Sequence, residues 1–323
     1  MSFSNPTNPS NPVILLSFDI EDWFQVENFK TCIPYSYWSK YEMRVEKNTH
    51  RILDLLDSIK IRPPTTQNNP INPINPTNPS NPTNPPSPIH PKATFFILGW
   101  VAERIPSLVN EIYNRGHEVA SHGLCHNLIY DCPIDDIKDD LISSKKMLED
   151  LIGDKVYGYR APSFSISDDF MNIVKESGYL YDSSYNSFGL HKRYGHVDLS
   201  NMDKCGIASR VLDNLYELPI SNIRLGKYSI PMGGGGYFRL FPSSVFHFGV
   251  RSILKKEGAY LFYMHPWEID PGQPRVRQAS TFYKFRHYIN LKRTYSKLTQ
   301  LIKSFSKCRF ITCCEYLNNL RVY

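Results

Sequence analysis

The sequence lacks a long run of apolar residues. No segment approaches the ~20 consecutive apolar residues that cross a bilayer as a helix. Residues 1–12 are polar and proline-rich, and they contain neither the basic region nor the apolar stretch of a secretory signal peptide. These absences predict a cytoplasmic protein without a signal peptide.

Cysteine pairs of the CxxC type are also absent. The seven cysteines are an odd number and are scattered along the chain, which argues against a dense disulfide framework and favours reduced thiols. A net charge of +6 over 323 residues is mild and gives no indication of nucleic-acid binding. We therefore expect no nucleic-acid partner.

Proline is concentrated in two Asn-Pro-rich stretches, which cover residues 5–12 and about 63–91. Proline removes backbone donors, and so polar a composition buries too little surface to offset the loss of chain entropy. We expect a disordered N-terminus over residues 1–12 and a disordered insertion at about 63–91, neither of which carries chemistry.

The rest of the chain alternates short apolar runs with amphipathic stretches. Strands are predicted over residues 13–18, 93–98, 118–120, 157–160, 215–219 and 259–264, and helices over residues 37–59, 101–114, 133–151 and 168–176. This alternation predicts parallel strands, in a barrel or in an open sheet. In both architectures the functional residues gather at the carboxyl ends of the strands.

Groups of polar residues follow four of these strands. They are Asp19, Glu21 and Asp22 after strand 13–18, His122 and His126 after strand 118–120, Arg160 and Ser163 at the end of strand 157–160, and His265 after strand 259–264. The two histidines are four residues apart and can therefore reach one metal ion. A single group of this kind has a structural explanation, but four groups at four strand ends indicate an active site.

Together these motifs resemble a known family. The segments SFDIED (17–22), SHGLCH (121–126), YRAPS (159–163) and YMH (263–265) resemble the NodB-type polysaccharide deacetylases, carbohydrate esterase family 4. Residues 19–24, GGGGYFR (233–239) and HPWEIDP (265–271) look like the branch associated with exopolysaccharide and exosortase gene clusters.

The resemblance covers about residues 13–301, apart from the Asn-Pro insertion. It implies an α/β fold, namely a distorted (β/α) barrel of the NodB-homology type with fewer than eight regular repeats. We expect a catalytic domain over residues 13–279 and a basic helical extension over residues 280–323 that packs on the barrel.

The resemblance also implies a divalent metal held by His122, His126 and one carboxylate. Zn²⁺ suits such a set, with Co²⁺, Mn²⁺ or Ni²⁺ as alternatives. The two aspartates that are adjacent in the commonest family pattern are separated here by Ile20 and Glu21. Glu21 would share a strand face with Asp19, whereas a turn after Ile20 would bring Asp22 inward. We predict Asp22 as the third ligand, with Glu21 as the alternative.

The acid and base groups are carried over from the family in the same way. Asp19 would be the general base and Arg160 would orient it, while His265 would be the general acid with Asp182 as its partner. The backbone N–H of Ser163 would stabilise the oxyanion that forms when water attacks the acetyl carbonyl.

Aromatic residues beside these motifs could stack on sugar rings, and we expect Trp23, Tyr237 and Trp267 to bind substrate. The expected reaction removes N-acetyl groups from N-acetylhexosamine residues of a polysaccharide or lipid-linked glycan precursor in exopolysaccharide biosynthesis. One alternative is a related metal-dependent amidase that acts on a small cyclic amide. The other is a non-catalytic glycan-binding protein, which would need no general base.

Residues 280–310 contain eight basic residues and no acidic residue. With Leu291, Leu298, Leu301 and Ile302 this segment could form a basic amphipathic helix. We favour packing of its apolar side on the barrel, and the alternative is peripheral contact with a membrane.

Overall fold

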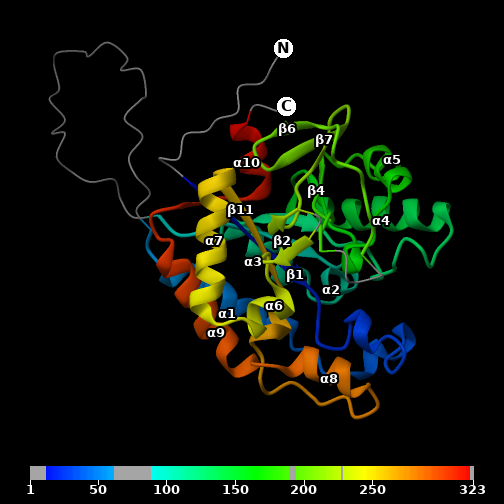
Figure 1. Ribbon diagram of the computed structural model, residues 1–323. Helices are drawn as coiled ribbons and strands as arrows, with labels where there is room; N and C mark the ends of the chain where they lie inside the picture. Colours follow the sequence, from blue (N-terminus) through cyan, green and yellow to red (C-terminus); the bar gives the residue numbers. More distant parts are fainter. Residues whose placement is uncertain (1–11, 62–88, 189–193, 227, 321–323) are drawn as a thin grey trace, which may run out of the picture.

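The computed structural model describes residues 12–61, 89–188, 194–226 and 228–320 (Figure 1). Of the two Asn-Pro-rich stretches predicted to be disordered, residues 1–11 and 63–88 lie outside this part of the chain. In the part that is described, helices surround a central sheet (Figure 1).

The centre of the sheet consists of parallel strands. The strand order is β11-β1-β2-β3-β4-β5-β8-β7-β6, in which the pairs from β11 to β8 are parallel and the last two pairs are antiparallel. The strands are β1 (Val13–Ile20), β2 (Ala93–Ile97), β3 (Glu118–Ser121), β4 (Gly158–Tyr159), β5 (Tyr181–Asp182), β6 (Asp203–Cys205), β7 (Ala208–Leu212), β8 (Leu215–Glu217) and β11 (Ala259–Met264). β1 is buried along almost its whole length, as expected for a parallel strand covered on both faces.

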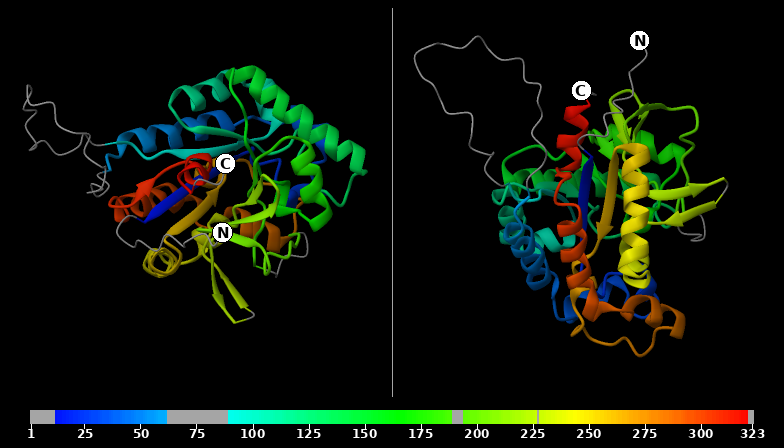
Figure 2. Two further views of the ribbon diagram at one scale, coloured as in Figure 1. Left: turned by 90° about the horizontal axis from the view of Figure 1, so that it is seen from above. Right: turned by 60° about the vertical axis from the view of Figure 1, so that its left-hand side comes forward.

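The chain beyond β8 curls back towards β11, at the other end of the strand order (Figure 2). Leu261 donates its N–H to the hydroxyl of Ser221 at 2.8 Å, and Tyr263 donates its N–H to the carbonyl of Gly233 at 2.8 Å. The expected α/β fold, with a parallel sheet and surrounding helices, is confirmed.

The helices before β11 are α1 (Val45–Ser58), α2 (Gly99–Arg104), α3 (Pro106–Asn114), α4 (Ile134–Ile152), α5 (Asp168–Glu176), α6 (Gly235–Leu240) and α7 (Ser243–Glu257). From β1 to β5 helices alternate with the strands as predicted, but the single helix predicted over residues 101–114 is two helices, and α6 and α7 were not predicted. Short 3₁₀ turns are η1 (Glu27–Phe29), η2 (Tyr35–Lys40), η3 (Pro162–Phe164) and η4 (Pro266–Ile269), and a two-stranded hairpin joins β9 (Asn222–Leu225) to β10 (Tyr228–Pro231). The single helix predicted over residues 37–59 is wrong, because η2 and α1 are separate.

The C-terminal segment continues the outer layer. It contains α8 (Thr281–Tyr288), α9 (Leu291–Ser304), β12 (Arg309–Phe310), which pairs with β1, and α10 (Cys313–Asn319). The apolar side of α9, formed by Leu291, Leu298, Leu301 and Ile302, is buried. Among the described residues no helix is both long and apolar enough to cross a membrane.

Candidate active site

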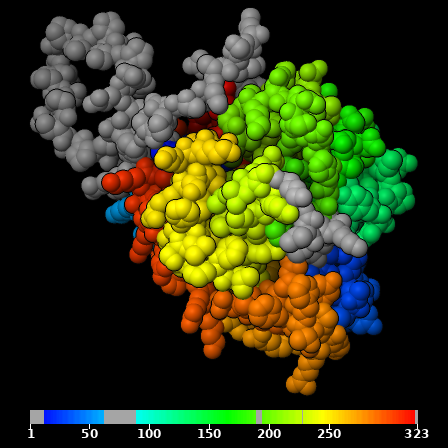
Figure 3. Space-filling model, viewed as in Figure 1, coloured from blue at the N-terminus to red at the C-terminus, as the bar shows by residue number. Residues whose placement is uncertain are grey.

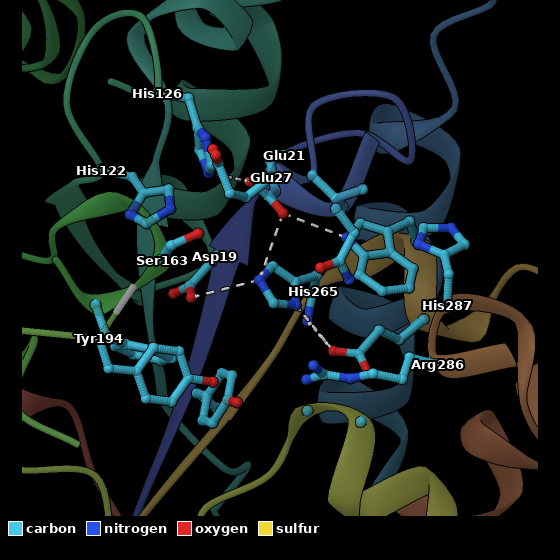
Figure 4. A pocket seen from close by; sticks show the side chains of 18 of the residues that line it. Asp19, Glu21, Glu27, His122, His126, Ser163, Tyr194, His265, Arg286 and His287 are labelled. Atoms are coloured by element: carbon cyan, nitrogen blue, oxygen red, sulfur yellow. Dashed lines mark hydrogen bonds and ion pairs between the residues drawn. The ribbon is translucent and has the colours of Figure 1, made fainter. Parts of the chain in front are cut away.

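Side chains from several strand ends meet in one pocket (Figure 4). The lining includes Asp19 and Glu21 from the end of β1, His122 and His126 from the loop after β3, Ser163 from η3, and His265 from the end of β11. The parallel arrangement explains this meeting, because the carboxyl ends of parallel strands lie at the same edge of a sheet.

Glu21, His122 and His126 form a cluster with the composition of a metal site. Their ligand atoms all lie within 4.8 Å of one another, and all three residues are buried. The Nδ1 of His122 lies 2.7 Å from the carbonyl of Arg160. Since a carbonyl can only accept, Nδ1 carries the proton and Nε2 is left with its lone pair. Burial lowers the pKa of His122 to about 4, so the ring is neutral at neutral pH.

A divalent cation fits the donors of this cluster. The Oε2 atom of Glu21 is buried without an aligned hydrogen-bond donor, although the Nε2 atom of His126 is only 2.7 Å away. Burial alone would favour the neutral acid, yet the imidazoles of His126, His265 and His122 hold the pKa of Glu21 at about 2. One carboxylate and two imidazoles are the donor set of a catalytic zinc site with open positions.

The prediction of Asp22 as the third ligand is wrong in geometry, because Asp22 lies outside this cluster and Glu21, the alternative, lies in it. Asp22 accepts backbone N–H groups from Trp23 at 2.8 Å, Arg44 at 2.5 Å and Val45 at 2.8 Å. Glu21 donates its own N–H to the carbonyl of Asp19, so the chain turns immediately after β1. This turn points Glu21 into the pocket and leaves Asp22 to hold the start of α1.

Asp19 is paired with a buried arginine, as predicted. The Arg160 guanidinium donates to Asp19 at 2.6 Å, and it also donates to the hydroxyl of Ser17 and to the carbonyl and hydroxyl of Ser183. Arg160 is completely buried. Several fixed partners therefore hold the guanidinium, and the guanidinium holds one oxygen of Asp19.

His265 lies on the other side of the carboxylates. Its Nε2 atom is 3.4 Å from Glu21 Oε1 and 3.7 Å from Asp19 Oδ2, while its Nδ1 atom is 2.9 Å from Glu268 Oε1. Burial opposes protonation of the ring, but the carboxylates of Glu21, Glu268 and Asp19 outweigh it and raise the pKa of His265 to about 9. The ring is therefore a proton donor at neutral pH.

The predicted partner of His265, Asp182, is corrected to Glu268. The carboxylate of Asp182 accepts from the N–H and the hydroxyl of Ser184. Register places Asp182 beside Glu217 of β8. Asp182 therefore organises the loop after β5, whose Ser183 holds Arg160.

Sequence reasoning missed Glu268 although a signal was present. Glu268 follows His265 by three residues and accepts the His265 N–H, which is the spacing of a capping box at the start of a helical turn. Glu268 also accepts from Arg239 at 2.7 Å, and both side chains are buried. Other residues of the pocket carried no such signal, among them Glu27, Asn28, Tyr194, Arg286 and His287.

The remaining predicted residues divide into two groups. Ser163 lines the pocket with a left-handed φ of 53°, and Trp267 lines it while stacked between the rings of His265 and His287. Trp23 and Tyr237 are absent from the described residues that line the pocket. Trp23 is buried against Phe24 and Tyr41, and Tyr237 packs on Phe188 and Phe241, so their assignment to substrate binding is corrected.

Two family models match this chain. Residues 90–181 match the model "Polysaccharide deacetylase", and residues 183–318 match "Domain of unknown function (DUF3473)". His122, His126 and Arg160 lie in the first match, whereas His265 and Glu268 lie in the second. The domain of unknown function thus contributes the candidate proton donor and its partner to the pocket.

Curated relatives align with the same part of the chain. A peptidoglycan deacetylase-like protein of Gibberella zeae is 33% identical over 96 residues, which are 30% of this chain and 28% of that protein. A peptidoglycan-N-acetylglucosamine deacetylase of Bacillus cereus is 30% identical over 88 residues, which are 27% of this chain and 41% of that enzyme. The chain therefore spans less than half the length of these relatives.

Solved structures share the fold over nearly the whole chain. A putative polysaccharide deacetylase from Mycobacterium smegmatis has a TM-score of 0.57 at 17% identity, covering 99% of this chain and 94% of that one. The Puue allantoinase has a TM-score of 0.57 at 13% identity, with 99% and 96% covered. At these identities the likeness concerns the fold alone. The family model and the curated relatives, in contrast, show that about 90 residues of this chain are similar in sequence to polysaccharide deacetylases.

Proposed function

We propose that this protein is a metal-dependent hydrolase that removes N-acetyl groups from N-acetylhexosamine residues of a glycan. One observation carries the proposal. The cluster of Glu21, His122 and His126 shares one pocket with a carboxylate and an imidazole that can act as base and acid. Asp19 is held by a buried arginine and His265 by a buried glutamate, and both line the pocket that contains the cluster. Binding alone requires neither group, which disfavours a non-catalytic glycan-binding protein.

The metal would be held by Glu21, His122 and His126. A divalent cation such as Zn²⁺ at these residues would polarise the acetyl carbonyl and lower the pKa of a bound water. His122 is held in place by its hydrogen bond to the Arg160 carbonyl. The guanidinium of the same residue, Arg160, holds Asp19. Arg160 therefore positions both the proposed metal ligand His122 and the proposed base Asp19.

Asp19 is the proposed general base. The Arg160 guanidinium donates to its Oδ1 atom, while Oδ2 lies on the side of His265. Asp19 therefore has one oxygen available to take a proton from the attacking water. The backbone N–H of Ser163 is the proposed donor to the oxyanion.

His265 is the proposed general acid. Glu268 fixes the ring through Nδ1, so Nε2 faces the pocket and can deliver its proton to the departing amine. Loss of the amine completes the hydrolysis to acetate and a free amino sugar. Trp267 stacks on the ring of His265 at 5.3 Å between centroids and limits its rotation.

The identity of the glycan is part of the proposal. Of the named relatives, the Bacillus cereus protein is by its printed name a peptidoglycan-N-acetylglucosamine deacetylase, and the Gibberella zeae protein is named as similar to a peptidoglycan deacetylase. The segments 233–239 and 265–271, which resemble the exopolysaccharide-associated branch, contribute Arg239, His265 and Glu268 to the pocket. We favour an exopolysaccharide or its lipid-linked precursor for this reason.

Acetate release tests the reaction. Protein reconstituted with Zn²⁺ is incubated with an acetylated glucosamine oligomer, and acetate is measured beside a His122→Ala variant. We expect release by the wild type and none by the variant, which lacks a metal ligand. Hydrolysis of small cyclic amides without release from the oligomer would favour the amidase alternative instead.

A further inference from the structure

A long part of the C-terminal region is entirely free of carboxylates. Residues 271–314 include no Asp or Glu, and they contain ten basic residues. These are Arg275, Arg277, Lys284, Arg286, Lys292, Arg293, Lys297, Lys303, Lys307 and Arg309. The segment is therefore complementary to a surface of negative charge.

Three aromatic side chains of α8 are exposed within this basic segment. Phe282 is 62% exposed, Phe285 is 57% exposed and Tyr283 is 38% exposed. Phe285 borders a shallow groove that is also lined by Arg275, Arg277 and Lys284. Exposed phenylalanines among cations are characteristic of protein surfaces that insert into the interface of a bilayer.

This surface differs from the apolar side of α9. Leu298, Leu301 and Ile302 are buried against the body of the protein, so they cannot contact a membrane. The exposed aromatic residues belong to α8 alone, the preceding helix. We call Phe282, Tyr283 and Phe285, with Arg275, Arg277 and Lys284, the α8 surface.

The α8 surface lies beside the mouth of the active site. Arg286 and His287 of the same helix line the pocket (Figure 4). The guanidinium of Arg239 donates to the carbonyls of Arg286, His287 and Ile289, which fixes α8 to the site. In the space-filling view the segment that contains α8 protrudes at the lower end of the molecule (Figure 3).

We propose that the α8 surface docks on a bilayer of anionic phospholipids. The phenylalanines enter the boundary between headgroups and acyl chains, and the surrounding cations face the lipid phosphates. The docking itself does not depend on the deacetylation chemistry. Its consequence does rest on the proposed function: a glycan carried on a lipid would be presented to the pocket at the membrane surface.

Vesicle sedimentation with the full chain tests the docking. The probes are vesicles of phosphatidylcholine alone and vesicles of equimolar phosphatidylglycerol and phosphatidylcholine. We expect binding to the anionic vesicles only, and a loss of at least about tenfold in the double variant Phe282→Ser, Phe285→Ser. Lys284→Gln should weaken binding about fivefold, which corresponds to one cation at an anionic surface. Phe248→Ser is the matched control, because Phe248 of α7 is 70% exposed but lies outside the α8 surface.

Three results would overturn the docking. The first is no binding to anionic vesicles, the second is equal binding by the double variant, and the third is binding to a soluble anionic polysaccharide in place of vesicles. Acetate release from a soluble oligomer needs no membrane, so it tests the proposed function independently of the docking. Phe282 and Phe285 do not line the described part of the pocket, so their variants should keep wild-type release.

Discussion

Glu21 and Asp22 are neighbours with different partners. We expect Glu21→Gln to lower the affinity for Zn²⁺ at least about tenfold, because one of three ligand atoms is weakened. Asp22→Ala should keep the metal but reduce the free energy of unfolding by about 3 kcal/mol, because three backbone N–H groups lose their acceptor. Metal content and urea denaturation measure the two effects. Loss of metal only in Asp22→Ala would restore Asp22 as the ligand.

His117 links stability to pH. The ring is 4% exposed, and neither nitrogen has a hydrogen-bond partner among the described residues. Burial, with the charge of Lys92 adding to it, lowers the pKa of His117 from 6.5 to about 4. Between these values the unfolded chain binds more protons, so stability falls as the pH falls from about 6.5 to about 4.

The size of this effect follows from the shift in pKa. It corresponds to about 3 kcal/mol at pH 4 relative to pH 7. Between pH 7 and pH 4 the free energy of unfolding, measured in urea, should therefore fall by about 3 kcal/mol less in His117→Leu than in the wild type. An unchanged slope in the variant would mean that the ring is protonated in the folded protein.

The individual site residues differ in how far the sequence predicts them. Asp19, His122, His126, Arg160 and His265 follow strands in recognisable motifs, and the structure brings them together. The chain does turn after Ile20 as considered, but the turn directs Glu21 into the pocket, because Asp22 is held by the backbone N–H groups of Arg44 and Val45, a contact that sequence spacing does not contain. Trp23 and Tyr237 lie beside motif residues, but a position in the chain does not reveal which way an aromatic ring points.

At the level of elements, the 3₁₀ turn η4 connects His265, the proposed general acid, to α6 and α8. Glu268 of η4 joins His265 to Arg239 of α6, and Arg239 holds α8. We expect Glu268→Gln to lower kcat about 10- to 100-fold with unchanged metal content. It should also cost about 3 kcal/mol of stability, because the buried Arg239 loses its countercharge.

A double variant separates these two consequences. Glu268→Gln with Arg239→Met removes both buried charges and should regain most of the stability. It should not regain kcat, since His265 still lacks its anionic partner. Recovery of kcat together with stability would show that Glu268 acts on folding and not on His265.

The elements with strong apolar patterns were predicted well. The strands β1 to β4, β8 and β11 coincide with predicted apolar runs, whereas β5, with only two residues, was missed. β6, β9 and β10 were missed because they are short, partly or fully exposed strands without a continuous apolar run. The boundary between η2 and α1 was missed because Asp22 fixes the start of α1 through a contact remote in the chain.

Across the whole molecule, the active site combines residues of the two family-model matches with the end of β1, which lies outside both. β11 from the second match pairs with β1 over six residue pairs, and β12 from the same match pairs with the start of β1. We propose that the chain folds as one cooperative unit. A fragment ending at residue 182 should therefore lack a cooperative unfolding transition, measured by circular dichroism in urea. A fragment with a sharp transition would show instead that the first match is a separate domain.

The central claim is that Asp19 acts as a base beside a metal held by Glu21, His122 and His126. The most direct measurement is acetate release from an acetylated glucosamine oligomer by wild type and Asp19→Asn at equal Zn²⁺ content. The account predicts release by the wild type and a loss of at least about 100-fold in the variant, because general-base catalysis contributes at least this much. Equal release by both proteins at equal metal content would contradict it.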